Sequence, residues 1–455
     1  MAEEVETGKV TFNGNTPQLR GLAIVTTLLT LVTLGIYRFW ARTRLRRYFW
    51  SAVTLDGHGF EYTGKGIEKF IGFLIAVAVL AIYLGIFQVA LSFAGMSLFE
   101  TVDPDADPIR QVLLTYATFF ALAPLIFYAQ YRARRYMLSR TKWKGIRFGA
   151  DQAAWGYAIR ALGHWMLTIA TLGILMPRQT YYLEKYKADR TWFGTAQFTQ
   201  QGRWQSLYPA MKHIVLGFVI AIIGGVILSL LAWKGSLEGD AAGTDIAFAV
   251  LAGFMIFVGI MWFYIGFAYY SVHSHRILTR NKKLGDNIKF TSEPRTARII
   301  GIYLLGGLIV SMLAPIVAGL IGGIIGVISN VALSGVDLGT GDNMSAGVVV
   351  GGVLGYIAFF VVAGVLSLIF ITQPILEHYA QVTTVHNAEE LADVTQREGD
   401  EMIEAEGFAD ALDVQFAKVT RVYQRLLTSC LRNRGAILLL SAAIIGSLPV
   451  LFSLA

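Results

Sequence analysis

The chain has few charged residues for its length. Only 15% of its 455 residues are charged, whereas 55% are hydrophobic, and the mean hydropathy is +0.55. Soluble proteins carry about 25% charged residues, so one buried segment does not account for the deficit. This composition excludes a soluble enzyme and indicates a protein whose main solvent is lipid.

Cysteine and the common catalytic motifs are also scarce. Cys430 is the only cysteine, which excludes a disulfide framework, a CxxC redox pair and a thiolate zinc site. The sequence has no P-loop, HExxH or GxSxG motif from which phosphate-binding, zincin or nucleophile-elbow chemistry could start. His273 and His275 are close in sequence, but two residues apart on a helix they point to different faces. We therefore expect no enzymatic activity, no metal site and no cofactor.

Long apolar runs are abundant. A helix needs about 20 apolar residues to cross the hydrocarbon core. Six runs reach this length, and they cover residues 70–94, 111–130, 213–233, 246–270, 297–328 and 345–373. A seventh run, 435–454, ends the sequence, and two further runs, 21–40 and 161–176, are harder to place. These runs predict a multi-pass membrane protein.

Basic residues mark one side of the predicted membrane. Four stretches hold 27 of the 38 Lys and Arg residues, and they cover residues 41–69, 129–160, 177–212 and 271–298. Three other stretches are acidic, and they cover residues 95–110, 234–245 and 328–346. Because cationic loops are retained in the cytoplasm, we predict that the four basic stretches are cytoplasmic. The polar residues 1–20 lack the features of a signal peptide, and we assign them to the cytoplasm as well.

The run 161–176 has predicted cytoplasmic stretches on both sides, which a single crossing cannot produce. A re-entrant or interfacial helix would satisfy this constraint. The run contains Thr171-Leu172-Gly173-Ile174, and the run 21–40 contains Thr33-Leu34-Gly35-Ile36, so we expect the same fold for both. The alternative is an ordinary span that violates the charge rule.

A short pattern also repeats along the chain. An Arg-rich helix end is followed by a turn and an anchor phenylalanine, and the anchors are Phe12, Phe60, Phe148, Phe198 and Phe290. Short units with one ambiguous apolar run alternate with long units that carry two spans. Thr11-Phe12-Asn13-Gly14 is interpreted as an isolated first half of the pattern.

Each repeat predicts a local β-hairpin. In the first, Asp56-Gly57 forms a turn signal between Ser51–Leu55 and Phe60–Thr63. Since a single hairpin is marginally stable in water, we expect the hairpins to pack with each other. The predicted fold is an all-α multi-pass membrane protein, a pseudo-repeated helical bundle with short re-entrant or interfacial helices and small cytoplasmic β-hairpins. The alternative for the repeats is unstructured basic loops.

Several of these segments resemble the YjgN family of bacterial inner-membrane proteins, a domain of unknown function. They are Thr33-Leu34-Gly35-Ile36-Tyr37-Arg38-Phe39-Trp40-Ala41-Arg42, Arg44-Leu45-Arg46-Arg47-Tyr48, Phe60-Glu61-Tyr62-Thr63-Gly64, Asn387-Ala388-Glu389-Glu390-Leu391 and Gly407-Phe408-Ala409-Asp410-Ala411-Leu412. The resemblance runs from about Val10 to Asp413. It implies a multi-pass location in the inner (cytoplasmic) membrane and supplies no catalytic residues.

Three residues are candidates for a polar cavity at membrane depth. Arg160 and His164 lie one helical turn apart at the start of the run 161–176, where ionisable groups usually face protein or water. Pro315 lies among glycines in a run that is long for one crossing, which is typical of the broken helices of transporters. The alternatives are an arginine that extends to the interface and a kinked structural helix.

A second set of candidates consists of arginines interleaved with aromatic residues. These arginines are Arg42, Arg44, Arg46, Arg47, Arg132, Arg134 and Arg135. Cations and aromatic belts anchor proteins at lipid headgroups, so we predict contact with anionic lipid. Nucleic-acid binding uses the same residue types, but here they adjoin spans that need anchoring, and we expect no nucleic-acid partner.

The sequence predicts four segments and two alternative functions. The segments are a cytoplasmic N-terminal part (1–20), a pseudo-repeated membrane domain (21–376), a charged cytoplasmic helical segment that could dock a protein partner (377–434) and a C-terminal span (435–455). The first function is a transporter or permease-like protein for a small or amphiphilic solute. The alternative is a non-transporting membrane scaffold that engages anionic lipid or another envelope protein.

Overall fold

The computed structural model describes residues 7–33, 35–93, 108–238, 243–332 and 346–397. Residues Met1–Thr395 belong to one compact unit. A second unit, Gln396–Ala455, lies outside the described residues except for its first two positions. The predicted span 435–454 and most of the predicted charged segment 377–434 therefore fall outside the described residues.

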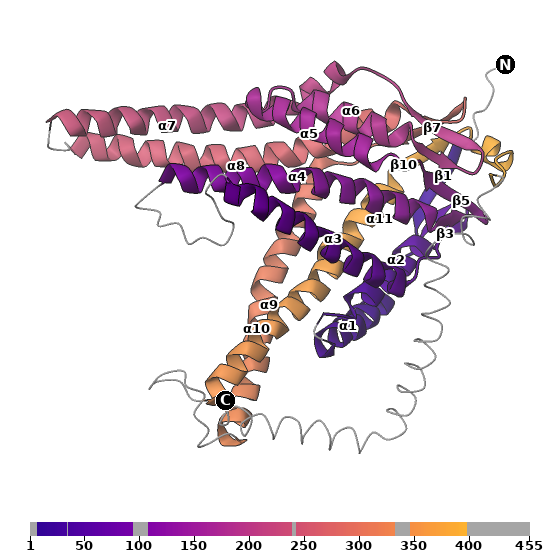
Figure 1. Cartoon of the computed structure of the whole chain (residues 1–455), viewed down its shortest axis with the longest axis horizontal. Helices are drawn as coiled ribbons and strands as arrows, with labels where there is room; N and C mark the ends of the chain where they lie inside the picture. Colours follow the sequence, from indigo (N-terminus) through magenta and orange to yellow (C-terminus); the bar gives the residue numbers. More distant parts are fainter. Residues whose placement is uncertain (1–6, 34, 94–107, 239–242, 333–345, 398–455) are drawn as a thin grey trace. The chain divides into compact units, whose positions relative to one another are not determined.

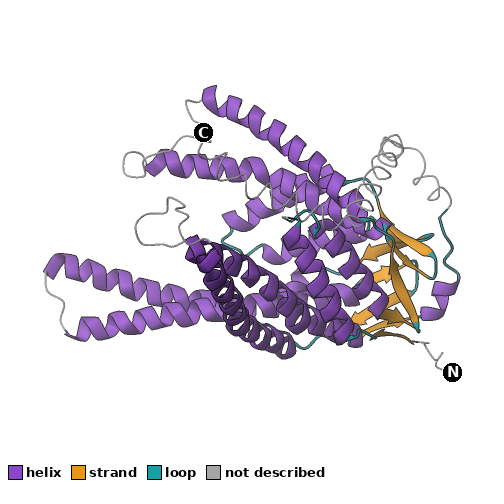
Figure 2. Cartoon of the chain, turned by 90° about the horizontal axis from the view of Figure 1, so that it is seen from below, coloured by secondary structure: helices purple, strands orange, loops and turns teal. Residues whose placement is uncertain are grey.

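The described residues form ten short strands, which close into one antiparallel barrel (Figure 2). The strands are β1 (Thr7–Phe12), β2 (Val53–Leu55), β3 (His58–Tyr62), β4 (Thr141–Trp143), β5 (Ile146–Ala150), β6 (Thr191–Phe193), β7 (Ala196–Gln200), β8 (Lys282–Leu284), β9 (Ile288–Ser292) and β10 (Thr383–His386). Each strand pairs with its neighbour in sequence, and β1 pairs with both β2 and β10. The predicted class was too narrow, because the repeats build one barrel rather than small hairpins attached to an all-α protein. Closure removes the exposed strand edges that isolated hairpins would leave.

Helices leave the barrel and return to it in pairs (Figure 1). The outgoing helices are α1 (Thr16–Val32), α3 (Gly66–Phe93), α5 (Ala154–Ala170), η1 (Trp204–Met211) with α7 (Lys212–Glu238), and α9 (Thr296–Ala332). The returning helices are α2 (Arg38–Ala52), α4 (Pro108–Ser139), α6 (Met176–Ala188), α8 (Gly243–Arg280), and α10 (Ala346–Ser367) with η2 (Leu368–Thr372) and α11 (Gln373–Gln381). Every strand hairpin therefore lies on the same side of the helical pairs that it connects.

The N-terminal strand β1 corrects the predicted repeat. We interpreted Thr11-Phe12-Asn13-Gly14 as a first half, but β1 occupies the position of a second strand and completes a hairpin with β10. Val10, and not Phe12, packs against the barrel core beside Phe60, whereas Phe12 packs with Leu19 of α1. The residues 7–12 and 383–386 thus supply the fifth hairpin of the ring.

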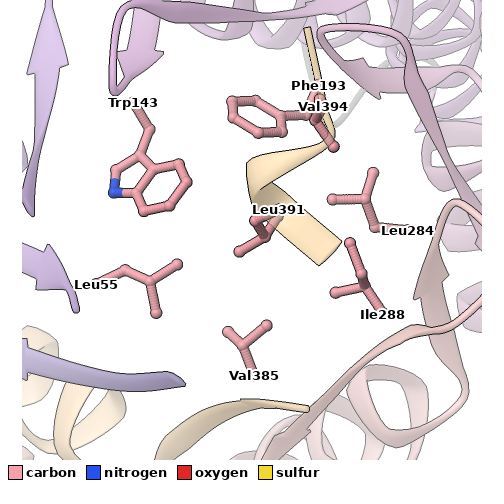
Figure 3. Close-up of a cluster of buried hydrophobic side chains, with 8 residues drawn as sticks. All are labelled: Leu55, Trp143, Phe193, Leu284, Ile288, Val385, Leu391 and Val394. Carbon is pink, nitrogen blue, oxygen red and sulfur yellow. The ribbon is translucent and has the colours of Figure 1, made fainter. Parts of the chain in front are cut away.

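The barrel interior is filled with apolar side chains. Alternate strand residues point inward, and Leu55, Trp143, Phe193, Leu284, Ile288 and Val385 are each at most 6% exposed. After β10 the chain turns back through η3 (Ala388–Ala392), which inserts Leu391 among these residues, and Val394 packs beside it (Figure 3). We call residues 388–395 the plug.

The two ambiguous apolar runs fold alike, as predicted. Each forms a helical pair, α1–α2 or α5–α6, joined by a tight turn in which Gly35 (φ +90°) or Gly173 (φ +88°) adopts a left-handed conformation. The hydroxyl of Thr33 accepts a hydrogen bond from the backbone N–H of Tyr37 at 2.9 Å. Thr171 accepts the equivalent bond from Leu175 at 3.3 Å. Whether these pairs re-enter the membrane or lie at its interface stays a prediction.

Five helical stretches of the described chain are long and apolar enough to cross a membrane. They are Gly66–Phe93, Trp204–Gly235, Asp245–Arg280, Thr296–Val331 and Gly347–Gln381. At most 17% of the residues in their most apolar windows are buried within the chain, so most of the apolar surface faces outward. Helix α4 follows α3 in the chain and covers the predicted span 111–130. It does not meet the same criterion of length and hydropathy.

Candidate functional site

The junctions between returning helices and strands share a hydrogen bond that recurs around the barrel. In four hairpins, the residue eight positions before the first strand residue that points into the barrel is an arginine or a lysine. Its side chain donates a hydrogen bond to a backbone carbonyl at the end of the second strand of that hairpin, or just beyond it. The bonds are Arg47 Nη2 to Gly64 O (3.1 Å), Arg135 Nε to Ala150 O (3.1 Å), Lys185 Nζ to Gln200 O (3.0 Å) and Arg276 Nη2 to Pro294 O (3.1 Å). We call these four bonds the junction clasps. They satisfy carbonyls that leave the strand ladder, which would otherwise lack a partner.

A second recurring hydrogen bond links four of the five units to the unit before it; in the remaining unit the equivalent residue is Ile277. The residue after the clasp position contacts the segment that follows the preceding hairpin. The contacts are Tyr48 OH to Asn15 O (2.8 Å), Tyr136 OH to Glu68 Oε2 (2.8 Å), Tyr186 OH to Ala153 O (3.0 Å) and Arg295 N–H to His378 Nε2 (2.9 Å). Consecutive units are thereby joined by side chains as well as by strand pairing.

The fifth unit departs from the clasp pattern. Its equivalent position holds Glu377, a carboxylate that cannot donate to a carbonyl. Glu377 accepts a hydrogen bond from Gln381 on its own helix instead, at 3.0 Å. The hairpin of β1 and β10 therefore closes the ring without this clasp.

A charged cluster lies where α6 meets the barrel. Glu184 contacts Lys282 at 2.9 Å and Lys187 at 2.7 Å. Burial alone would raise the pKa of Glu184, but the two lysines outweigh burial and hold the pKa of this carboxyl far below its ordinary value. Nearby, Gln200 is 1% exposed and donates to the carbonyl of Leu278 at 3.0 Å. Sequence reasoning missed this cluster, whose one signal is a lysine at a strand position that is apolar or Thr in the other hairpins.

Arg160 and His164 both have partners within the α5–α6 pair. The Arg160 guanidinium lies 5.0 Å from the centre of the Tyr186 ring and donates to the carbonyl of Gly156 at 3.0 Å. The His164 ring stacks on Tyr182 with 5.5 Å between centroids. Its Nδ1 is 3.5 Å from Arg178 Nη1. Both side chains therefore contact residues of α5 and α6 themselves.

Pro315 lies inside α9, which is one continuous helix from Thr296 to Ala332 and not a broken one. It borders a groove of about 600 Å³ between α9 and α10. The groove is lined mainly by glycine, alanine and valine, with Asn330 at one position. Neither Arg160 nor His164 is among its lining residues. Within the described chain, the structure does not bring the three predicted cavity residues together.

Five of the seven candidate lipid-contact arginines contact other parts of the protein. Arg47, Arg134 and Arg135 donate to protein acceptors, Arg134 through Nη2 to Thr191 Oγ1 at 3.4 Å, and Arg44 and Arg46 lie over tyrosine rings. Arg42, Arg44, Arg47 and Arg132 are exposed. Lipid contact by these residues stays a prediction, and the structure adds a role for three of them in binding the protein itself.

No group of three or more His, Cys, Asp or Glu side chains in the described ranges could hold a metal ion. The polar contacts that recur in these ranges are contacts within the protein, at the strand ends and between consecutive units. The main structural features of the described chain are therefore the junction clasps, the filled barrel and the plug.

Comparison with known protein families shows which family the chain belongs to. The profile of a bacterial protein of unknown function, DUF898, matches residues 7–411. The chain belongs to the DUF898 family. This match spans the whole barrel and confirms the family resemblance that the sequence segments indicated. No solved structure matches the chain.

Named relatives of this DUF898 protein are similar over part of its length. It is 29% identical to the inner membrane protein YjgN of Salmonella typhimurium over 149 residues, which is 32% of this chain and 33% of the relative. It is 27% identical to YjgN of Escherichia coli K12 over 154 residues, 34% of each chain. The matched region is about a third of the relatives' length. Together with the five candidate spans, these relatives assign the protein to the bacterial inner membrane.

Proposed function

We propose that this DUF898 protein is a non-transporting scaffold of the inner membrane. In this proposal the barrel holds the helical pairs in place and engages another envelope protein or anionic lipid. The observation that carries the proposal is the filling of the barrel. Leu391 of the plug inserts among the inward side chains, so the ring from which the helical pairs leave is a packed core (Figure 3).

The cross-linking of the ring supports the same function. A carrier that alternates between two states moves one bundle of helices against another around a fixed site. Here each junction clasp fixes a returning helix to its own hairpin, and the tyrosine contacts join consecutive units of one closed barrel. Such cross-linking favours a rigid platform over a hinge between two halves.

A permease-like function for a small or amphiphilic solute is the second candidate. The groove of about 600 Å³ beside Pro315 favours it, because the substrate sites of repeated transporter folds lie between helices within the membrane. The groove is largely apolar, which fits an amphiphilic solute better than an ion. This candidate requires the groove to join a polar path across the membrane.

The two functions differ in what happens to solute pools. Untargeted measurement of intracellular and extracellular solutes and lipids in cells that lack the protein, contain it or overproduce it separates them. The scaffold proposal expects no pool that follows the amount of protein. A solute whose distribution scales with the protein, and reverts when Gly323 is replaced by Leu to fill the groove, would overturn the scaffold proposal in favour of transport.

A further inference from the structure

The outer wall of β8, β9 and β10 carries a row of aligned basic side chains. Lys283 lies directly opposite Lys289 across β8 and β9, and Lys289 lies directly opposite His386 across β9 and β10. Because Leu284, Ile288 and Val385 point into the core, these three neighbours point outward. We call Lys283, Lys289 and His386 the cationic ladder.

Hydroxyl groups surround the ladder. Thr199 lies opposite Lys283, Thr7 lies opposite His386, and Thr291 Oγ1 is 2.9 Å from His386 Nε2. Within the described ranges, neither Lys283 nor Lys289 forms an ion pair. Two carboxylates lie at the turn end of this hairpin: Asp286 is exposed in the turn, and Glu390 accepts a hydrogen bond from Asn287 of the same turn at 2.9 Å. The ladder row itself consists of the two lysines and the histidine, flanked by hydroxyl groups.

The ladder is not explained by the fold. Like charges directly opposite each other destabilise a sheet. Lysines often protect exposed sheet edges from pairing with other chains, but a closed barrel has no edge. On the other wall Lys142 also lies opposite a cation, Arg147, but its second neighbour is the carboxylate Glu61, whereas the ladder row contains no carboxylate. The lack of a carboxylate in the ladder row favours a binding partner of opposite charge.

We propose that the cationic ladder binds an acidic segment of a protein partner. Strands in a sheet are about 4.8 Å apart, so the ladder presents closely spaced cations that can each bind a carboxylate through a charge-assisted hydrogen bond. Lys283 and Lys289 lie close to the β8–β9 turn. This turn is at the end of the hairpin opposite to the end that joins α8 and α9. This position favours a protein segment over headgroups of the bilayer that the helices cross. The inference rests on the proposed scaffold function and names the chemistry of its partner.

The test uses the purified full-length protein in detergent and a fluorescein-labelled oligoglutamate peptide, with binding measured by fluorescence anisotropy. The wild-type protein is expected to bind the peptide with an affinity that falls as salt rises, because exposed charges are screened. The double variant Lys283→Gln/Lys289→Gln is expected to bind about tenfold more weakly or worse, a loss of about 1.4 kcal/mol. Equal binding by this variant and the wild type would overturn the proposal.

The matched control removes the same number of charges from the other wall. Lys142→Gln/Arg147→Gln is expected to bind the peptide within about twofold of the wild type, a difference too small to indicate a lost contact. The ladder variant should keep or raise the thermal midpoint, since it removes a repulsion, and this excludes misfolding as the cause of lost binding.

Competitors decide the class of partner. Vesicles of phosphatidylglycerol and single-stranded DNA are added to the bound peptide at matched charge concentration. If either binds the wild type more tightly than the peptide does, and loses binding in the ladder variant, the ladder is a lipid or nucleic-acid site and the proposal fails. If the peptide does not bind and solute pools still do not follow the protein, the acidic partner is rejected while the scaffold function stands.

Discussion

Where helices meet the barrel, a single side chain can neutralise several partly buried charges. Glu184 is the clearest case, because it contacts both Lys282 and Lys187 and its side chain is 20% exposed. Removing one partner of a buried charge group leaves the others without compensation, and this destabilises more than the group itself stabilises. The same reasoning does not extend to exposed pairs such as Lys234 with Asp245, where solvent weakens the interaction.

We therefore predict that Glu184→Gln lowers stability by roughly 2–3 kcal/mol at neutral pH, measured as a drop in thermal midpoint in detergent. Because the pKa of Glu184 is held below its ordinary value of 4.5, the folded state binds its proton less readily than the unfolded state. The contribution is present above about pH 4.5 and is lost as pH falls further. The wild type should lose stability on acidification below this pH more steeply than the variant.

Glu61→Gln provides the control for this prediction, since Glu61 is exposed on the outer wall of the barrel. Its thermal midpoint should stay near that of the wild type at neutral pH. A Glu184→Gln protein with the midpoint and the pH profile of the wild type would show that the two lysines do not depend on this carboxylate.

At the scale of elements, glycines bring α9 and α10 into close contact. A side chain at Gly322 would place its Cβ 2.7 Å from the carbonyl oxygen of Gly351 and 2.8 Å from the Cα of Gly355. A side chain at the adjacent Gly323 would meet no atom within 4 Å. Small residues at such contacts let helix backbones approach in a membrane, so the two neighbouring glycines have different roles.

We predict that Gly322→Val lowers the thermal midpoint, with a cost of about 1–3 kcal/mol from overpacking against backbone that cannot move aside. The neighbouring substitution Gly323→Val should cost far less, because its side chain enters open space beside the groove. Thermal unfolding of the two variants in the same detergent compares them directly. Equal losses would mean that α9 and α10 do not pack through Gly322.

At the scale of the whole molecule, the barrel ties the topology together. The β2–β3, β6–β7 and β8–β9 turns belong to one ring, so they must lie on one side of the membrane. We predict that cysteines placed at His58, Thr195 and Asp286 in a Cys430→Ser background all react with an impermeant thiol reagent only after the inner membrane is opened. Labelling of one of them in intact spheroplasts would contradict the cytoplasmic assignment.

The local features of this fold could be predicted from the sequence, and the long-range ones could not. The Asp56-Gly57 turn and the two Thr-Leu-Gly-Ile turns were visible because a few adjacent residues determine them. Closure was not visible, since Thr7 pairs with His386 through backbone groups that every residue possesses. The plug was hidden for a similar reason, because Leu391 lies in a charged stretch whose composition predicts an exposed segment.

Arg160, His164 and Pro315 show the same limit at the candidate site. Each is an unusual residue in an apolar run, which is why the sequence singled it out. Their spatial relation depends on which helical pairs neighbour each other around the ring, and a sequence with alternating units does not specify this. The junction clasps could have been found by aligning the five units on their inward strand residues rather than on phenylalanine.

The pairing of β1 with β10 has a consequence for biosynthesis. A ribosome releases β1 several hundred residues before its partner β10, so the circle stays open until β10 has been synthesised. Until then, the sheet formed by the earlier hairpins has a strand edge without a hydrogen-bonding partner, and we expect holdase chaperones to bind that edge. A circular permutant that keeps the plug, joins residue 395 to residue 7 through a linker, and starts instead at the Gly145 turn should assemble the same circle in a different temporal order.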